Sequence, residues 1–255
     1  MADTSFIGII PARYASTRFP GKPLAKLGDC TVIERCYRRV ASVLGENVVV
    51  ATDDDRILRA VEAFGGKAVM TSASHKSGTD RCLEAYRITG SRADVIINIQ
   101  GDEPFIAPEQ IRAVMECFNS PRTRIATLAR PFAPERPYAE LANPNTPKVI
   151  ISNDGNALMF SRSVIPYIRS YPQEQWPSAT QYHTHIGLYA YRADTLAEIT
   201  ALPQSQLEIA ESLEQLRWLQ NGYQIRVAVN NSPTIGIDTP ADLESARKYL
   251  EEHGE

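Results

Sequence analysis

The strongest constraint on the fold is the alternation of short apolar runs with helical patterns in the first hundred residues. Strand-like runs occupy 6–10, 47–51, 67–70 and 94–99. Apolar residues spaced three and four positions apart, as in amphipathic helices, occupy 31–44, 55–64 and 79–88. Strands that alternate with helices pair in parallel, because each helix returns the chain to the same edge of the sheet. The sequence therefore predicts an α/β fold with a mostly parallel central sheet.

From about residue 124 to residue 191 the pattern changes to strand-like runs joined by long, proline-rich connections. These runs are 125–129, 148–152, 157–160 and 186–191. We expect them to form an inserted or edge antiparallel layer. The chain is then expected to end with a helix at 207–221, a strand at 225–229 and a helix at 240–250. The length suits a single domain spanning 1–255, with the layer inserted at about 124–191.

Four aromatic residues stand in polar connections of the predicted layer: Tyr167, Tyr171, Trp176 and Tyr182. Exposed aromatic residues are typical of protein interfaces, which would make the layer the contact surface of a homodimer. Packing of the same rings in a core under the loops explains them equally well. The sequence leaves both interpretations open.

Composition excludes several classes of partner. The net charge of −3 and the isoelectric point near 5.9 argue against a nucleic-acid-binding surface. The four cysteines lack the spacing of a zinc site, so we expect reduced thiols. The amino terminus does not resemble a signal peptide, and no apolar run has the length of a membrane span. We expect a cytoplasmic protein with no membrane or nucleic-acid partner.

The loop that follows the first predicted strand, Pro11 to Gly28, carries four cations and no acid. Ligands of open α/β sheets bind at the carboxyl ends of strands, where Arg13, Arg18, Lys22 and Lys26 could bind phosphates. The spacing matches neither a P-loop nor the Gly-x-Gly-x-x-Gly fingerprint, so the phosphates would be held in another arrangement. The alternative is a basic loop that faces water.

Two aspartates follow other apolar runs. Asp102 stands directly after the most apolar strand-like run, and Asp238 lies between another apolar run and a helical pattern. Carboxylates beside a phosphate site indicate Mg²⁺, which takes hard oxygen ligands from protein and phosphates. The alternatives are a turn-forming role for Asp102 and a favourable helix-dipole position for Asp238.

Other polar residues are weaker candidates. The segment Ser77 to Arg81 begins a predicted helix and could bind an anion or a base edge, although helix capping explains it equally well. His183 and His185 share a strand face with Tyr189; with no third metal ligand evident, hydrogen bonding to a sugar is favoured. For Glu208, Glu211, Glu214 and Arg217, spaced three apart, a solvated helix face is the default interpretation.

Together these motifs resemble the 3-deoxy-manno-octulosonate cytidylyltransferases, or CMP-Kdo synthetases. The resemblance rests on 10–24, 51–54, 77–81, 98–104, 160–162, 185–191 and 213–217. It departs at Thr184, where many relatives have Lys or Arg. The resemblance implies a Rossmann-like nucleotidyltransferase fold, Mg²⁺ dependence, a homodimer, and transfer of CMP from CTP to Kdo with release of pyrophosphate for lipopolysaccharide biosynthesis. A CMP-sialic acid synthetase and an inactive CTP-binding regulator are the alternatives.

The resemblance also implies roles for individual residues. The residues expected to contact CTP are Arg13, Ser16, Lys22, Ser77, Gly78, Thr79 and Gln100. The residues expected to contact the sugar acid are Arg18, Gln100, Arg162, His185, Tyr189, Glu214 and Gln215. Asp102 and Asp238 would hold Mg²⁺, and with Arg13 and Lys22 they would make up the catalytic set.

Overall fold

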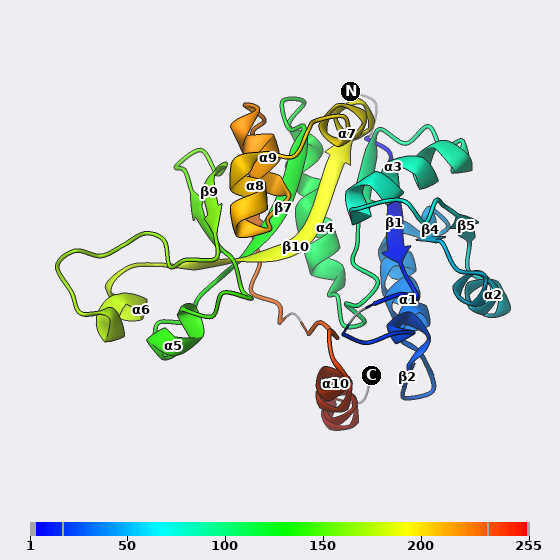
Figure 1. Cartoon of the computed structure of the whole chain (residues 1–255), viewed down its shortest axis with the longest axis horizontal. Coiled ribbons are helices and arrows are strands. Elements are labelled where there is room, and N and C mark those ends of the chain that lie inside the picture. Colours follow the sequence, from blue (N-terminus) through cyan, green and yellow to red (C-terminus); the bar gives the residue numbers. More distant parts are fainter. Residues whose placement is uncertain (1–3, 17, 234, 254–255) are drawn as a thin grey trace. The chain divides into compact units, whose positions relative to one another are not determined.

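The computed structural model describes residues 4–16, 18–233 and 235–253 (Figure 1). Its contacts group the chain into two compact units. The first comprises 1–112, 192–200 and 233–255, and the second comprises 113–191 and 201–232. Each unit is described by itself below. The single domain with an insertion at about 124–191 stays a prediction.

The sheet of the first unit is parallel throughout, as predicted. Its strands are β1 (Phe6–Ala12), β4 (Val48–Thr52), β5 (Ala68–Met70) and β6 (Val95–Asn98), in the order β6-β1-β4-β5. Every residue of β4 and β6 is buried. Strands buried on both faces carry continuous apolar runs, which is why the sequence located them within one or two residues.

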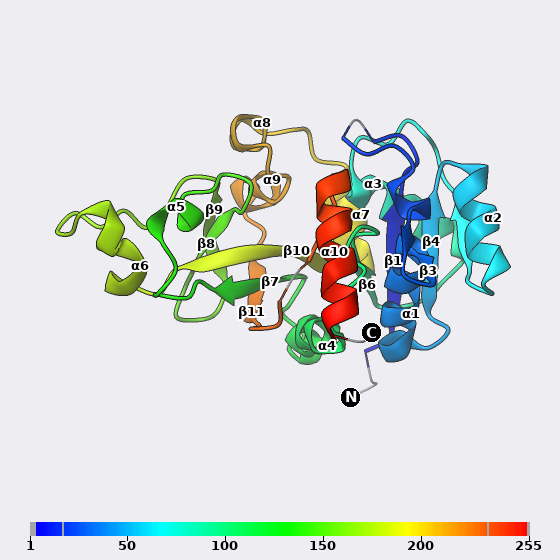
Figure 2. The same cartoon turned by 90° about the horizontal axis from the view of Figure 1, so that it is seen from below.

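The predicted helices of this unit are α1 (Val32–Leu44), α2 (Asp55–Ala63), α3 (Gly78–Thr89) and α10 (Pro240–His253). The first three helices are preceded by the N-cap residues Thr31, Asp54 and Ser77. The side chain of each accepts a hydrogen bond from a backbone N–H in the first turn. Helix α10 packs beside the short hairpin of β2 (Lys26–Leu27) and β3 (Cys30–Thr31) (Figure 2).

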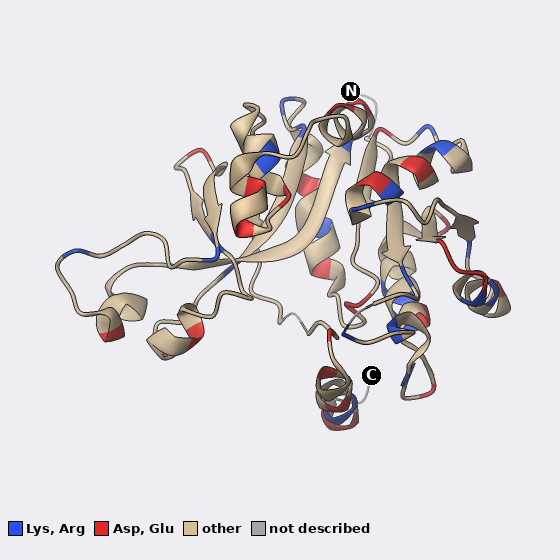
Figure 3. Ribbon diagram, viewed as in Figure 1, with Lys and Arg blue, Asp and Glu red and all other residues tan. Residues whose placement is uncertain are grey.

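Further helical segments were not expected from the sequence. They are η1 (Lys22–Leu24), α4 (Pro108–Glu116), η2 (Cys117–Asn119), α5 (Tyr138–Leu141), η3 (Gln173–Gln175), α6 (Trp176–Ala179) and α7 (Ala193–Thr200). Acidic and basic residues alternate along α3 (Figure 3). The four cysteines are free thiols, as expected. In the described part of the chain no helix combines the length and hydropathy needed to cross a membrane.

The second unit contains the predicted antiparallel strands. They are β7 (Ile125–Pro131), β8 (Lys148–Ile151), β9 (Ala157–Ser161) and β10 (His183–Arg192). Strand β10 pairs antiparallel with β7 and β8, and β8 pairs antiparallel with β9, whereas β11 (Ile225–Val229) runs parallel to β7. The pairing of β10 with β7 shifts register between Ile186 and Tyr189, which marks a β-bulge.

The helix predicted at 207–221 is wrong as a single element. The structure has α8 (Gln206–Glu211) and α9 (Gln215–Gln220), separated at Ser212, which adopts a left-handed conformation with φ 50°. The break removes the single solvated face expected for the glutamates. Glu208 is instead buried and lies 3.2 Å from the Arg217 guanidinium.

The four aromatic residues of the layer divide into two pairs. Trp176 and Tyr182 are buried in a cluster with Phe132 and Leu141, and the Tyr182 hydroxyl donates to the carbonyl of Pro166. Core packing therefore explains this pair. Tyr167 and Tyr171 remain 73% and 52% exposed.

Candidate active site

A cavity of about 420 Å³ lies at the carboxyl end of β1, within the first unit. Its walls come from the cationic loop, the start of α3 and the segment after β6. It is lined by Pro11, Ala12, Arg13, Ala15, Ser16, Arg18, Lys22, Pro23, Lys76, Gly78, Gln100, Gly101 and Asp102. The structure thus brings Arg13, Ser16, Arg18, Lys22, Gly78, Gln100 and Asp102, all candidates from the sequence, to one place.

Lys22 joins the two predicted metal ligands. Its Nζ lies 2.6 Å from Oδ2 of Asp102 and 3.3 Å from Oδ1 of Asp238. Arg18 adds a second cation, 3.0 Å from the same Asp238 oxygen. The backbone N–H of Ile237 donates to the carbonyl of Asp102, which fastens the two segments together. Asp102 and Asp238 therefore both contact the ammonium of Lys22, while their role as shared metal ligands stays a prediction.

Glycine is required where the segment after β6 meets the end of β1. A Cβ atom at Gly101 would lie 2.9 Å from the carbonyl oxygen of Pro11, closer than such atoms approach. Because backbone forms this contact, no side-chain movement could relieve it. The absent side chain lets Asp102 reach the cationic loop.

The start of α3 carries the predicted nucleotide contacts. Ser77 caps the helix by accepting a hydrogen bond from the N–H of Asp80, so the capping interpretation is confirmed. Thr79 is buried, and Gly78 lines the cavity. An anion or base edge at this helix end stays a prediction.

The loop before α3 is held by contacts that the sequence did not reveal. The Arg13 guanidinium donates to the carbonyl of His75, and the His75 ring lies 2.5 Å from the Glu84 carboxylate. Arg81, fully buried, donates to Thr71 and pairs with Asp53 at 2.7 Å. These contacts hold the loop before α3 against the helix and against the segments that carry Arg13, Asp53 and Thr71.

The donor set suits a hard cation. Two carboxylate groups plus substrate phosphates are a common arrangement for Mg²⁺, which seldom has a complete protein cage. Asp102 and Asp238 already converge on the ammonium of Lys22, so the position attracts positive charge. Across residues 4–16, 18–233 and 235–253, no group of three or more His, Cys, Asp or Glu side chains is arranged to hold a metal.

The second unit gathers other predicted sugar contacts. The rings of His185 and Tyr189 lie 5.3 Å apart, and the edge of Trp218 packs on Tyr189 at 5.2 Å. Four strand positions would normally separate two residues by about 13 Å, so the β-bulge between them is what brings the rings together. Burial lowers the pKa of His185 to about 3, and the ring is therefore neutral near pH 7. Burial, together with Glu214, raises the pKa of Tyr189 well above its ordinary value.

Buried polar atoms around this cluster lack a hydrogen-bond partner among the described residues. They include Nε2 of Gln215, in a residue only 5% exposed, and the indole Nε1 of Trp218. Buried polar groups are nearly always satisfied, and an orphan calls for an explanation. Hydroxyl groups of a bound sugar would supply the missing partners.

Arg162 is held by backbone carbonyls at the end of α8. Its guanidinium donates to the carbonyls of Glu211, Pro144 and Ser212 at 2.6, 2.8 and 3.2 Å. The Glu211 carboxylate accepts hydrogen bonds from the Ser161 hydroxyl and the Arg162 N–H. Glu211 thus ties down the strand end that carries Arg162, although its spacing in the sequence had indicated a solvated helix face.

The remaining predicted contacts are placed as follows. Glu214 pairs with Arg217 at 3.0 Å in the second unit. Arg18 and Gln100 belong to the first unit, and Arg162, His185, Tyr189, Glu214 and Gln215 belong to the second.

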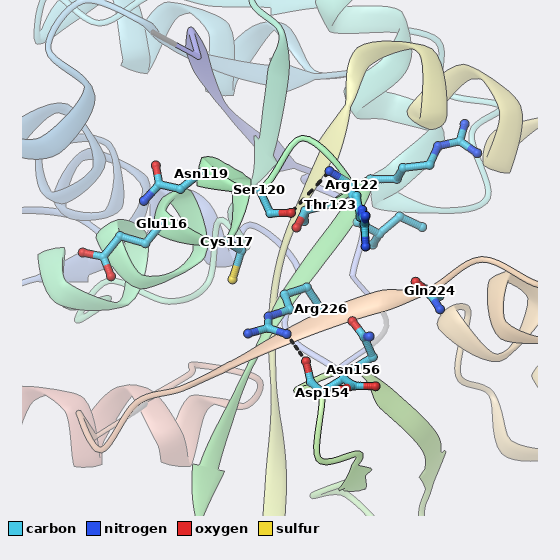
Figure 4. Close-up of a pocket in the computed structure, with 12 residues that line it drawn as sticks. Glu116, Cys117, Asn119, Ser120, Arg122, Thr123, Asp154, Asn156, Gln224 and Arg226 are labelled. Atoms are coloured by element: carbon cyan, nitrogen blue, oxygen red, sulfur yellow. Dashed lines mark hydrogen bonds between the residues drawn. The ribbon is translucent and has the colours of Figure 1, made fainter. Parts of the chain in front are cut away.

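A separate cavity of about 690 Å³ lies within the second unit (Figure 4). Arg122, Arg124 and Arg226 line it together with Glu116 and Asp154. The Arg226 guanidinium donates to the carbonyl of Asp154 (Figure 4). Because charges of both signs face this space, its lining favours neither an anion nor a cation.

The model of one protein family, Cytidylyltransferase, matches residues 7–225. The chain therefore belongs to the cytidylyltransferase family. A putative glucose-1-phosphate thymidylyltransferase from Bacillus anthracis, 15% identical with a TM-score of 0.64, shares the fold alone.

More similar proteins define the group within this family. The 3-deoxy-manno-octulosonate cytidylyltransferase of Bacteroides thetaiotaomicron is 60% identical over 96% of this chain and 98% of its own. That of Phocaeicola vulgatus is 60% identical over 97% and 98%. A solved CMP:2-keto-3-deoxy-manno-octonic acid synthetase in complex with CTP is 42% identical, covers 98% of this chain and 99% of its own, and has a TM-score of 0.89. The resemblance predicted from the motifs is confirmed: the chain is a member of the 3-deoxy-manno-octulosonate cytidylyltransferase family.

Proposed function

We propose that this chain is a nucleotidyltransferase that transfers CMP from CTP to the anomeric hydroxyl of 3-deoxy-D-manno-octulosonate, giving CMP-Kdo and pyrophosphate. The observation that carries the proposal is the convergence of Lys22, Asp102 and Asp238 beside the cationic loop. Family membership supports the choice of CTP and Kdo as substrates.

The sugar hydroxyl oxygen attacks the α-phosphorus of CTP in line. A bond forms from the hydroxyl oxygen to the α-phosphorus as the bond from the α-phosphorus to the oxygen that bridges to the β-phosphate breaks. Pyrophosphate leaves with that bridging oxygen, and the hydroxyl proton is released to solvent. Lys22 and Arg13 stabilise the charge on the leaving group. Asp102 and Asp238 would hold Mg²⁺, which when bound neutralises charge on the phosphates.

The sugar acid requires a different set of groups. Arg18 and Arg162 would bind its carboxylate, for which the planar guanidinium is better suited than an ammonium. Gln100, His185, Tyr189, Glu214 and Gln215 would bind its hydroxyls. The orphaned Nε2 of Gln215 supports this assignment, because a hydroxyl of the sugar would satisfy it.

The exposed pair Tyr167 and Tyr171 favours a homodimer contact on the antiparallel layer. Sedimentation of the wild-type chain and of a Tyr167→Ser, Tyr171→Ser variant tests this part. A dimer that persists in the variant contradicts the proposed interface. We place the reaction in the cytoplasm, in lipopolysaccharide biosynthesis.

Pyrophosphate release tests the activity directly. The chain is assayed with each of four nucleoside triphosphates, combined with Kdo or with a sialic acid. We expect release with CTP and Kdo, and a loss of at least about 100-fold in Asp102→Asn with the fold retained. A higher rate with sialic acid than with Kdo would indicate a CMP-sialic acid synthetase instead. CTP binding without pyrophosphate release would indicate a regulator, and normal turnover in Asp102→Asn would contradict the metal assignment.

A further inference from the structure

Thr127 of β7 stands opposite the bulge of β10 and touches four groups of that strand, one of which is the hydroxyl of Tyr189. Its hydroxyl oxygen lies 3.0 Å from Nε2 of His185, 2.8 Å from the carbonyl oxygen of Leu188 and 3.3 Å from that of Ile186. Thr127 is fully buried, so water does not compete for these bonds. None of the motifs in the sequence pointed to it.

The hydroxyl has one proton to donate, and two of its neighbours are carbonyl oxygens that can only accept. The Tyr189 hydroxyl can donate its own proton to the Thr127 oxygen, which has two lone pairs. The shortest contact, to Leu188, takes that proton. The hydroxyl oxygen is then left as an acceptor toward His185, whose Nε2 must carry a hydrogen. In the neutral ring the other nitrogen, Nδ1, then carries a lone pair. Among the described residues the hydrogen bond of the His185 ring is the one to Thr127, so this lone pair can accept from a ligand.

We propose that Thr127 is a positioning residue that holds His185 in the Nε2–H tautomer, so that Nδ1 accepts a hydrogen bond from a hydroxyl of the sugar acid. The second half of this inference rests on the proposed function. The bulge contributes by placing the Tyr189 ring next to the same imidazole. One side chain thereby sets both the proton arrangement of His185 and the shape of the strand that carries it.

The tautomer is read from long-range ¹H–¹⁵N spectra of the full chain with labelled histidine, recorded without substrate near pH 7.5. The chain has four histidines, and a His185→Gln variant identifies the signals of His185. We expect a protonated Nε2 and a bare Nδ1 in the wild type and in Thr127→Ser, which keeps the hydroxyl. Thr127→Val, which replaces the hydroxyl by a methyl group of similar size, should give a mixture of tautomers.

Kinetics supply the second readout. We expect the KM for the sugar to rise about fivefold to tenfold in Thr127→Val, with the KM for CTP unchanged and Thr127→Ser close to the wild type. A merely structural role would change both KM values or neither. An Nδ1–H tautomer in the wild type, or a Thr127→Val variant with unaltered tautomer and sugar KM, overturns the inference.

The two readouts also separate this inference from the proposed function. If the wild type releases no pyrophosphate with Kdo, the sugar-binding half fails together with the function. The spectra need no substrate, so they still decide the role of Thr127 toward His185. If Thr127→Val does not fold, the spectra of the wild type and of Thr127→Ser decide the tautomer. Thr127→Ala then takes the place of Thr127→Val in the kinetic measurements.

Discussion

The ammonium of Lys22 lies 2.6 Å from the carboxylate of Asp102, and it reaches Asp238 at 3.3 Å. The Lys22 side chain is only 12% exposed, so this charge is largely shielded from water. A lysine that neutralises both proposed metal ligands competes with a divalent cation for them. We expect the phosphates of bound CTP to offer the ammonium new partners and so to free the two carboxylates for the cation.

Replacing Lys22 by methionine should therefore have opposite effects on metal binding and on catalysis. We expect Mn²⁺ to bind the nucleotide-free protein at least about threefold more tightly, because its competitor is gone. We expect turnover to fall by about 100-fold or more, because the leaving phosphates lose a cation. Mn²⁺ titration followed by electron paramagnetic resonance and a pyrophosphate assay measure the two effects. Lys26→Met, in the same loop but with an exposed side chain, is the matched control. Unchanged Mn²⁺ affinity in Lys22→Met would disprove the competition.

Gln215→Met should make the protein more stable and bind the sugar less well. The substitution removes a buried amide N–H that lacks a partner, so we expect the free energy of unfolding to rise by about 1 kcal/mol. The KM for the sugar should rise about tenfold. Urea denaturation and steady-state kinetics test both effects.

Gln220→Met provides the contrast for Gln215, because the Gln220 side chain accepts a hydrogen bond from the N–H of Leu207. The same chemical change should there lower stability slightly and leave the KM unchanged. Destabilisation by Gln215→Met without a change in sugar KM would refute a sugar contact at this position.

Glu211→Gln should loosen Arg162. The carboxylate accepts from the Ser161 hydroxyl and the Arg162 N–H, and an amide can face only one of these donors with its oxygen. We expect a loss of about 2 kcal/mol in the free energy of unfolding and a sugar KM raised several-fold, with the KM for CTP unaltered. Thermal denaturation and kinetics measure these effects, with exposed Glu174→Gln as the control. If Glu211→Gln behaves as Glu174→Gln does, Glu211 does not position Arg162.

Acidification should destabilise the fold through His185. Burial lowers its pKa from 6.5 to about 3 in the folded chain. The contribution of this histidine to stability is thus fully present above its unfolded pKa, near 6.5, and is lost as the pH falls toward 3. The loss between pH 7 and pH 5 should reach at most about 2 kcal/mol, because the residue keeps partial exposure.

The measurement is the free energy of unfolding by urea at several pH values between 7 and 5. His185→Gln should remove this part of the pH dependence, and His253→Gln, at an exposed position, should keep it. If the free energy of unfolding depends on pH in the same way in the wild type and in His185→Gln, burial does not hold the His185 ring neutral.

The parallel half of the fold could be predicted because its signals are local. The residues of β6 are apolar on both faces, and Thr31, Asp54 and Ser77 mark helix starts by their own side-chain chemistry. The break between α8 and α9 at Ser212 could not be predicted, because the helical spacing of apolar residues continues through it. The partners that favour the break are distant: its carbonyl accepts a hydrogen bond from Arg162, 50 positions away in the sequence.

The candidate site divides in the same way. Asp102 and the loop cations follow strands directly, so their shared position at the sheet edge could be predicted from the order of elements. Thr127 and Glu211 could not be found in this way. Thr127 looks like any strand residue until the register of β10 is known, and Glu211 fits the pattern of a solvated helix.

The ion pair between Lys22 and Asp238 spans 216 positions of the sequence. A ribosome must therefore translate nearly the whole message before the second carboxylate can meet the loop that was synthesised first. Any shortened product that stops before Asp238 would keep the parallel strands of the first unit and could resemble a folded protein, yet it would hold only half of the proposed magnesium site. If the proposed magnesium site is correct, we expect products that end before Asp238 to be inactive.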